Sequence, residues 1–324
     1  MMSKRLSTSV GLTLTAALAG AFFLFVGQGE PQAAPRVREY TLEIVPQDIE
    51  VAPGAVWHAW TYNGSVPAPT LTVKAGETLR VRVINRHTLT HSFHTHLAPY
   101  SFENDGSQAN IITGRGAASM IPPGGEYTYE FHPTIPGTYY YHCHSADGGF
   151  LITQHIKQGL YGAIVVLGAD EAPVRDEVVF MGEIGHDVTG SGARPVFIMN
   201  GKGIPGGEHT LERIFREQGF AGVAAQLGKT VPVFTAQVGE PVRLHVINIG
   251  DIEHSFHLHG MNLISQEMFP GRIWPANVIQ LVSGGADSVL ITPQEEGLWL
   301  FHCHVVGHAD AGMIGVFVVS GAAT

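Results

Sequence analysis

The sequence is poor in cysteine and in charged residues. Only two of its 324 residues are cysteine, 14% are charged, and the net charge is −10. No cluster of Lys and Arg occurs in the body of the chain, which argues against a role in nucleic-acid binding. Two cysteines could form one disulfide in an exported protein. However, Cys143 and Cys303 each lie between two histidines. Such flanks add nothing to a disulfide and favour metal binding.

A long apolar run occurs near the N-terminus, from Val10 to Val26, directly after Lys4 and Arg5. This pattern is typical of an export signal, although the run is slightly short for a bilayer span. We expect residues 1–34 to be a cleaved signal peptide, with an uncleaved N-terminal anchor as the alternative. The rest of the chain is then periplasmic, secreted or membrane-anchored outside the cytoplasm.

The chain contains an internal repeat. Residues 76–96 and 239–259 align without a gap and are identical at eleven of twenty-one positions. A second pair follows in each half, GTYYYHCH at 137–144 and GLWLFHCH at 297–304. This repetition indicates a duplicated domain.

Both halves show the pattern of β-strands. Residues 79–83 and 242–246 alternate apolar and polar side chains, as strands with one buried face do. The forty glycines and nineteen prolines suit many short strands joined by turns. We expect an all-β fold of two Greek-key β-sandwiches, at 35–170 and 171–324, with the boundary in 168–177. The segment 201–229 is predicted as a long loop with a short helix around 211–217.

The clustered histidines follow strand geometry. Side chains at i and i+2 point to one face of a strand and the side chain at i+1 to the other. In each His-Cys-His motif the imidazoles therefore lie opposite the thiol, and His91 and His254 lie opposite the His-x-His pairs that follow them. Each half is thus predicted to have a sulfur side and a histidine side. The four histidine-side residues are His94, His96, His142 and His144 in the first half, and His257, His259, His302 and His304 in the second.

The sulfur side of the second half has the ligand set of a blue copper centre. His254, Cys303, His308 and Met313 supply two imidazoles, one thiolate and a thioether. Zinc is the competing metal for a Cys/His set. The first half offers His91, Cys143 and His155, but Leu160 stands at the position of Met313. A copper at this site would lack the axial sulfur, and its reduction potential would be higher.

The eight histidine-side imidazoles suit a cluster of three coppers. Four imidazoles from one half cannot build it, so a first half must meet a second half within the chain or between chains. The remaining histidines, including His87 and His245, are assigned no metal-binding role.

These motifs resemble the multicopper oxidases, in particular the small two-domain laccase-like group with cupredoxin-like domains and blue-copper ligands in both domains. The resemblance rests on the four His-x-His elements and on HCHVVGHADAGM at 302–313. It implies that His94 and His257 hold a type 2 copper, and that a type 3 pair is held by His96, His142, His144, His259, His302 and His304. It also implies a homotrimer with clusters between subunits. Tyr100 and Asp105 would lie near the cluster as a redox-active phenol and a proton donor. The alternative is a packed tyrosine and an aspartate of the turn at 104–106.

The expected function is oxidation of phenols, aromatic amines or metal ions by single-electron steps, coupled to reduction of dioxygen to water. No methionine-rich insert occurs, which argues against a dedicated cuprous oxidase. A copper nitrite reductase is the alternative enzyme, and a blue-copper electron carrier is the alternative without catalysis. Both alternatives leave histidines of the two histidine sides unexplained.

Overall fold

The computed structural model describes residues 36–52, 54–108, 112–184 and 196–321. The predicted signal or anchor, residues 1–34, lies outside this range. Within the described part of the chain, no helix combines the length and the apolar character needed to cross a bilayer.

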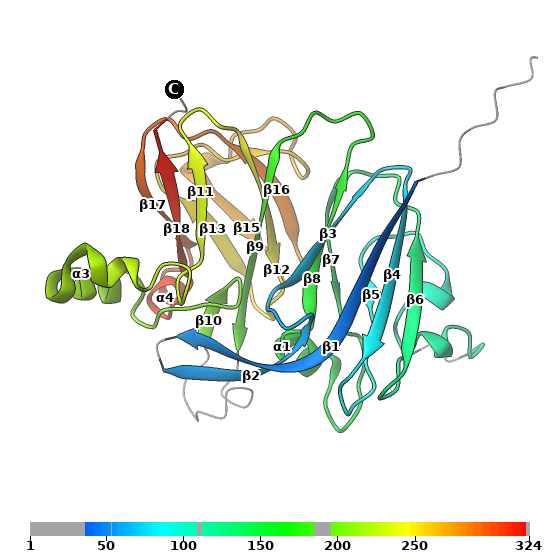
Figure 1. The fold of residues 1–324 in the computed structure, drawn as a ribbon. Coiled ribbons are helices and arrows are strands. Elements are labelled where there is room, and N and C mark those ends of the chain that lie inside the picture. The colour runs from blue at the N-terminus through cyan, green and yellow to red at the C-terminus, as the bar shows by residue number, and fades with distance from the viewer. Residues whose placement is uncertain (1–35, 53, 109–111, 185–195, 322–324) are drawn as a thin grey trace, which may run out of the picture. The chain divides into compact units, whose positions relative to one another are not determined.

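The first half consists of two four-stranded sheets (Figure 1). Their orders are β2-β1-β4-β6 and β3-β8-β7-β5. The strands are β1 (Val37–Ala52), β2 (Ala55–Tyr62), β3 (Ala68–Lys74), β4 (Thr78–Asn85), β5 (His94–Thr95), β6 (Glu126–Phe131), β7 (Gly137–His142) and β8 (Tyr161–Leu167). One buried cluster takes side chains from both sheets, so the core of this half lies between them.

The second half repeats this plan with two five-stranded sheets, β10-β9-β12-β16-β14 and β11-β18-β17-β13-β15. The strands are β9 (Arg175–Ile184), β10 (Val196–Met199), β11 (Val233–Gln237), β12 (Val242–Asn248), β13 (His254–Leu258), β14 (Ile264–Ser265), β15 (Val278–Leu281), β16 (Ala286–Ile291), β17 (Gly297–Cys303) and β18 (Ile314–Ser320). A second buried cluster fills the space between its sheets.

The predicted alternation is confirmed in β4, and in β12 it holds for the apolar positions, whereas the polar His245 is also buried. Leu79, Val81 and Val83 of β4 are fully buried, while Arg82 between them is exposed. The side chains of β12 that carry the same pattern, Val242, Leu244 and Val246, are also fully buried. The prediction of an all-β fold with two cupredoxin-like domains is therefore confirmed.

Helices in the described residues are few. They are α1 (Ile152–Lys157), α3 (Gly207–Ala224), α4 (Val306–Asp310) and the 3₁₀ turns η1 (Phe102–Asn104), η2 (Ala117–Ser119) and η3 (Pro275–Asn277). The helix predicted around 211–217 exists within α3, which is longer than expected and is broken at Gly219, where φ is 67° and ψ is −165°. It extends beyond the sheets of the second half (Figure 1). Leu211 and Ile214 bury its inner face against Ile314 and Val316, and this packing stabilises it.

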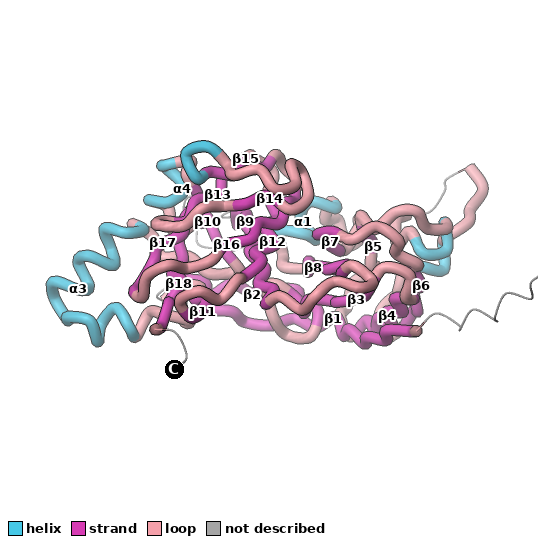
Figure 2. The backbone as a smooth tube through the Cα atoms, turned by 90° about the horizontal axis from the view of Figure 1, so that it is seen from above, coloured by secondary structure: helices cyan, strands magenta, loops and turns pink. Residues whose placement is uncertain are grey.

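The two halves contact each other through the β1–β2 hairpin. Its far end runs alongside the second half, where the Gly203 N–H donates to the carbonyl of Val51 at 2.7 Å. A separate buried cluster joins Trp57 and Ala59 of β2 to Phe180 and Ile198 of the second half. Viewed from above, the two halves lie side by side (Figure 2). The loop 168–174 joins β8 to β9, and the exact domain boundary stays a prediction.

Candidate metal centres

The first sulfur site consists of His91, Cys143 and His155. Cys143 Sγ lies 3.5 Å from His91 Nδ1 and 3.4 Å from His155 Nδ1, and the two imidazole nitrogens are 3.2 Å apart. All three side chains are fully buried. Cys143 follows the end of β7 and His155 lies on α1, so a strand and a helix separated by a loop bring the ligands together.

The second sulfur site repeats this geometry with His254, Cys303 and His308. Sγ of Cys303 lies 3.8 Å from Nδ1 of His254 and 3.6 Å from Nδ1 of His308. The Cys303 N–H donates to the carbonyl of Met313 at 3.1 Å. In the first half the Cys143 N–H donates to the carbonyl of Leu160 at 3.0 Å. Leu160 therefore occupies the place of Met313, as the spacing predicted.

The chemistry of the sulfur sites fits a metal cation. Both cysteines are free and buried. Burial raises the pKa of the Cys143 thiol to about 11 and lowers the pKa of His91 to about 3. A buried thiol and two neutral imidazoles that converge on one point offer soft and borderline donors to a metal, which would deprotonate the thiol.

The first histidine quartet consists of His94, His96, His142 and His144. β5 pairs with β7 so that His94 lies opposite His142. Nε2 of His96 and Nε2 of His142 are 3.3 Å apart. His144 joins through its ring, whose centroid is 4.7 Å from that of His94.

The second histidine quartet, His257, His259, His302 and His304, has the same construction. His257 pairs with His302 across β13 and β17. Nε2 of His259 lies 3.1 Å from Nε2 of His302, and the rings of His257 and His304 have centroids 5.2 Å apart. Three histidines of each set place donor atoms within 4.8 Å of one another, namely His94, His96 and His142, and His257, His259 and His302. His144 and His304 lie next to these triads through ring contacts alone.

Hydrogen bonds to backbone carbonyls define the protonation of four of these imidazoles. Nδ1 of His94 lies 2.6 Å from the carbonyl of Asp105, and Nδ1 of His257 lies 2.8 Å from that of Asn277. His142 and His302 each place Nδ1 near the carbonyl of the following cysteine, at 3.1 and 2.9 Å. A carbonyl only accepts, so Nδ1 carries the proton and Nε2 keeps the lone pair that a metal needs.

Five buried side-chain atoms of the described residues have no hydrogen-bond partner, and one of them belongs to a quartet histidine. Among the described residues, Nδ1 of His144 finds no hydrogen-bond partner although it is buried. Buried polar atoms are normally paired, so an unpaired imidazole nitrogen at this place also fits a metal.

The two quartets do not meet within one chain. Each set of described donors within 4.8 Å of one another belongs to a single half. His96 and His142 instead line a cavity of about 260 Å³ whose other wall includes Ile249, Asp251 and Gly284. No described residue of the second quartet lines this cavity.

Tyr100 and Asp105 lie beside His94, as the prediction places them. The Tyr100 ring is perpendicular to that of His94 with centroids 6.1 Å apart, and Asp105 Oδ1 is 3.4 Å from His94 Nδ1. Burial and the nearby carboxylate of Asp105 raise the pKa of Tyr100 to about 12. The proposed roles of phenol and proton donor stay predictions.

Four neighbours of the sites were not predicted. Tyr140 places its hydroxyl 3.3 Å from His96 Nδ1, and the Trp60 ring lies 5.0 Å from that of His155. His87 and Glu183 contact the first histidine of the first and second sulfur sites, respectively. The repeat alignment could have drawn attention to His87, because Gly250 stands at the matching position.

Glu183 changes the electrostatics of the second sulfur site. Burial alone would lower the pKa of His254, but hydrogen bonds to Cys303 and Glu183 outweigh burial and raise it. In the same way, burial would raise the pKa of Glu183, but hydrogen bonds from His254 and the Asp251 backbone lower it. His254 and His91 therefore shift in opposite directions.

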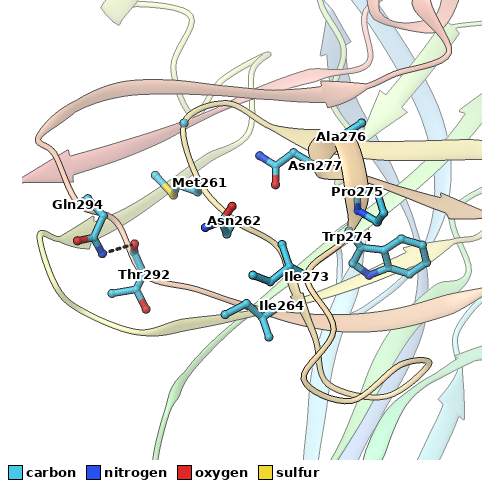
Figure 3. Close-up of a pocket in the computed structure, with 11 residues that line it drawn as sticks. Met261, Asn262, Ile264, Ile273, Trp274, Pro275, Ala276, Asn277, Thr292 and Gln294 are labelled. Carbon is cyan, nitrogen blue, oxygen red and sulfur yellow. Dashed lines mark hydrogen bonds between the residues drawn. The ribbon is translucent and has the colours of Figure 1, made fainter.

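A groove of about 700 Å³ is lined by residues around β14 and η3 (Figure 3). Gly260, the residue after His259, also lines it. Its wall includes the apolar side chains Met261, Ile264, Ile273 and Trp274. Asn277 at the same groove is the residue whose carbonyl faces His257. The second quartet therefore borders an open, partly apolar surface.

The fold and the sites together define a copper-binding oxidoreductase. Two models of the multicopper oxidase family match residues 44–171 and 208–322. The chain belongs to the multicopper oxidase family. A solved multicopper oxidase is 28% identical, with a TM-score of 0.69, and the match covers 88% of this chain and 89% of that one. A blue copper oxidase from Nitrosomonas europaea, at 21% identity and a TM-score of 0.67, shares the fold; the match covers 88% of this chain and 86% of that one.

Relatives in sequence carry the names of nitrite reductases. A probable nitrite reductase-hydroxylamine oxidoreductase fusion protein of Kuenenia stuttgartiensis is 29% identical over 86% of this chain, which spans only 31% of that relative. A copper-containing nitrite reductase of Neisseria meningitidis is 27% identical over 90% of this chain and 74% of its own length.

Proposed function

We propose that this chain is a laccase-like oxidase that takes single electrons from phenols, aromatic amines or metal ions and reduces dioxygen to water. The observation that carries the proposal is the presence of a histidine quartet in each half, with Nε2–Nε2 distances of 3.3 and 3.1 Å. Two close imidazole nitrogens in each half suit a coupled pair of metal ions shared between the halves.

Reduction of dioxygen to two waters takes four electrons and four protons. Copper at the sulfur sites would accept electrons one at a time, and copper held by the quartets would supply them to dioxygen. We assign a type 1 site to each sulfur site, a type 2 site to His94 and His257, and a type 3 pair to the other six quartet histidines. Cys303 lies between His302 and His304, so the backbone itself joins the two kinds of site.

We infer that electrons enter at the second sulfur site. His308 is partly exposed, whereas His91 and His155 are fully buried. Phe197 stacks on His308 with ring centroids 4.1 Å apart. This contact holds the imidazole in one orientation. Outer-sphere electron transfer to such an edge requires little shape matching, which suits a broad range of small donors.

We propose that the cluster forms between copies of the chain, in a homotrimer. Support comes from the cavity at the first quartet, whose opposite wall belongs to the 249–251 loop and not to the second quartet. The second quartet in turn borders the open groove lined by Ile273 and Trp274. A first half of another copy would supply the missing imidazoles.

Copper nitrite reductase is the second candidate, favoured by the names of the relatives. Its catalytic copper needs three histidines, which leaves much of the two quartets without a role. Copper content and turnover separate the two functions. The oxidase should bind about five coppers per chain, or about four if the first sulfur site stays empty.

The decisive measurement compares oxygen uptake with nitrite consumption. Copper-loaded protein is given a phenolic, a ferrous or a cuprous donor in air, and a reduced donor with nitrite under argon. We expect oxygen uptake without peroxide release, and little nitrite consumption. Rapid nitrite turnover with fewer coppers and without oxygen uptake would instead favour the reductase.

A further inference from the structure

The two sulfur sites differ in the group that contacts Nε2 of their first histidine. This is the remote ring nitrogen, the one that does not face the cysteine. In the second site, Nε2 of His254 donates to the carboxylate of Glu183 at 3.2 Å. The side chain of His254 is 0% exposed and that of Glu183 only 8%. In the first site, Nε2 of His91 lies 2.9 Å from Nδ1 of His87, so its partner is a second imidazole and not a carboxylate.

Gly250 makes room for the contact between His254 and Glu183. A Cβ atom at this position would lie 2.2 Å from Glu183 Oε2 and 2.9 Å from His254 Nε2. Both distances are shorter than atoms tolerate, and the end of the Glu183 side chain would have to move. The backbone at 250 therefore admits the carboxylate because it carries no side chain.

In the first half, different residues stand at both positions of this glycine–glutamate pair. The gap-free repeat places His87 at the position of Gly250. Strand register places Pro46 at the position of Glu183, because Ile44 pairs with Asn85 as Met181 pairs with Asn248. Thus one half has a carboxylate next to a glycine, and the other has an imidazole and no carboxylate.

The charged groups at and around Glu183 give the second site a net negative charge. Lys157 Nζ lies 3.8 Å from Glu183 Oε1 and also pairs with Asp251. The Asp251 N–H donates to Glu183 Oε1 at 2.7 Å. Two carboxylates and one ammonium give a net charge of about −1 next to His254. The carboxylate of Asp147, near the first site, instead accepts from the Thr90 N–H at 2.7 Å.

We propose that Glu183 lowers the reduction potential of the second sulfur site below that of the first. The inference rests on the proposed function, namely on a copper at the Cys303 site. A carboxylate that accepts from the remote N–H makes the imidazole a stronger donor, and its charge stabilises the cupric state more than the cuprous state. Glu183 acts through His254 and is a positioning residue.

The difference gives the two sites separate tasks. The partly exposed second site becomes the weaker oxidant, so its electrons flow readily to the histidine cluster. The buried first site, with Leu160 in place of Met313 and no carboxylate partner, becomes the stronger oxidant. It fills first and holds its electron until the cluster reacts.

The test is a redox titration of the blue absorption in the copper-loaded, full-length Cys143→Ser chain, in which only the Cys303 site contributes. In this parent, Glu183→Gln should raise the potential while the blue band persists. We expect the cupric-to-cuprous ratio at a fixed applied potential to fall about tenfold, which for one electron is about 59 mV. Gly250→Ala, which keeps the charge but displaces the carboxylate, should shift the potential in the same direction.

Glu177→Gln is the matched control, because Glu177 lies on the same strand and pairs with Arg175 at 2.8 Å. It should change the ratio less than about twofold, because Glu177 lies six residues from Glu183 along β9, roughly 20 Å, and a partly exposed charge at that distance is screened. If the reduction potential of Glu183→Gln is unchanged or lowered, the inference about Glu183 is wrong, but the proposed function is not affected. If Glu183→Gln does not fold, the same result in Gly250→Ala has the same meaning. A parent without a blue band overturns the copper assignment of the Cys303 site as well.

Discussion

Cys303 and Cys143 hold equivalent places in the two halves but differ in access to solvent. We expect Cys303→Ser to abolish the blue absorption of the second site and to lower oxygen uptake roughly hundredfold or more. Loss of a group that only hydrogen-bonds to a metal ligand can already lower activity by up to about a hundredfold, and loss of the ligand itself should cost at least as much. The reason is that His308 offers a partly exposed edge to a donor, whereas His91 and His155 are fully buried. Steady-state oxygen consumption with a phenolic donor measures the loss.

Cys143→Ser is the matched replacement for this experiment. It should retain a large part of the turnover, because the second sulfur site feeds the cluster through His302 and His304. Equal turnover of the Cys303→Ser chain and the wild type would show that donors enter elsewhere.

At the residue scale, the candidate ligands could be predicted because they share short motifs. A period of two places His302 and His304 on one face and Cys303 on the other, and the structure keeps this sorting in both halves. Glu183 could not be predicted in this way. It lies seventy-one positions from His254, and only the pairing of β9 with β12 brings the two together.

At the scale of single elements, the packing of β9 can be tested at Phe180, because β9 contributes to the contact between the halves. Its side chain is 1% exposed and packs on Tyr161 with ring centroids 5.0 Å apart. We expect Phe180→Ala to lower the free energy of unfolding by about 3–5 kcal/mol, through lost burial and a cavity. Phe220→Ala on α3 is the control, because this ring is 58% exposed and should change stability by less than about 0.5 kcal/mol. Denaturant titration measures both, and equal effects would contradict the assigned packing.

Strands with a regular alternation of apolar residues were predictable from the sequence. The full length of α3 was not, because its apolar residues follow no clear helical period. Glycine and charged residues dominate 201–229, so a loop with a short helix was expected. Leu211 and Ile214 find buried partners in β18, and the helical residues that follow the break at Gly219 add Val223 to the same cluster. Tertiary packing overrides weak local propensity at such positions.

At the scale of the whole molecule, a hydrogen-bond network joins the halves and should make stability depend on pH. His245 lies 2.6 Å from Thr138 Oγ1 of the first half and 3.0 Å from Asp176 Oδ1. Arg243 also donates to Asp176, at 2.6 Å. Burial would raise the pKa of Asp176, but the hydrogen bonds from His245 and Arg243 outweigh it and lower the pKa.

A lowered carboxyl pKa stabilises the fold above the unfolded pKa of about 3.9, and this contribution is lost as pH falls through the folded pKa. Asp176→Asn should therefore melt at a lower temperature than the wild type at pH 7, and the difference should shrink below about pH 4. Thermal unfolding at several pH values measures it. A difference that stays constant down to the most acid pH would rule out this linkage.

Two quartets that do not meet within a chain can be tested by mixing two defective chains. His142→Ala damages only the first quartet, and His302→Ala only the second, so either chain alone should reduce little oxygen. In a ring each contact joins the first half of one chain to the second half of the next. Random mixing of the two variants then places two intact quartets together at about a quarter of the contacts, and oxygen uptake should recover to about that fraction of the wild type. Chains that use both quartets internally gain nothing from mixing, so a co-expressed pair as inactive as its separate members would exclude a cluster between subunits.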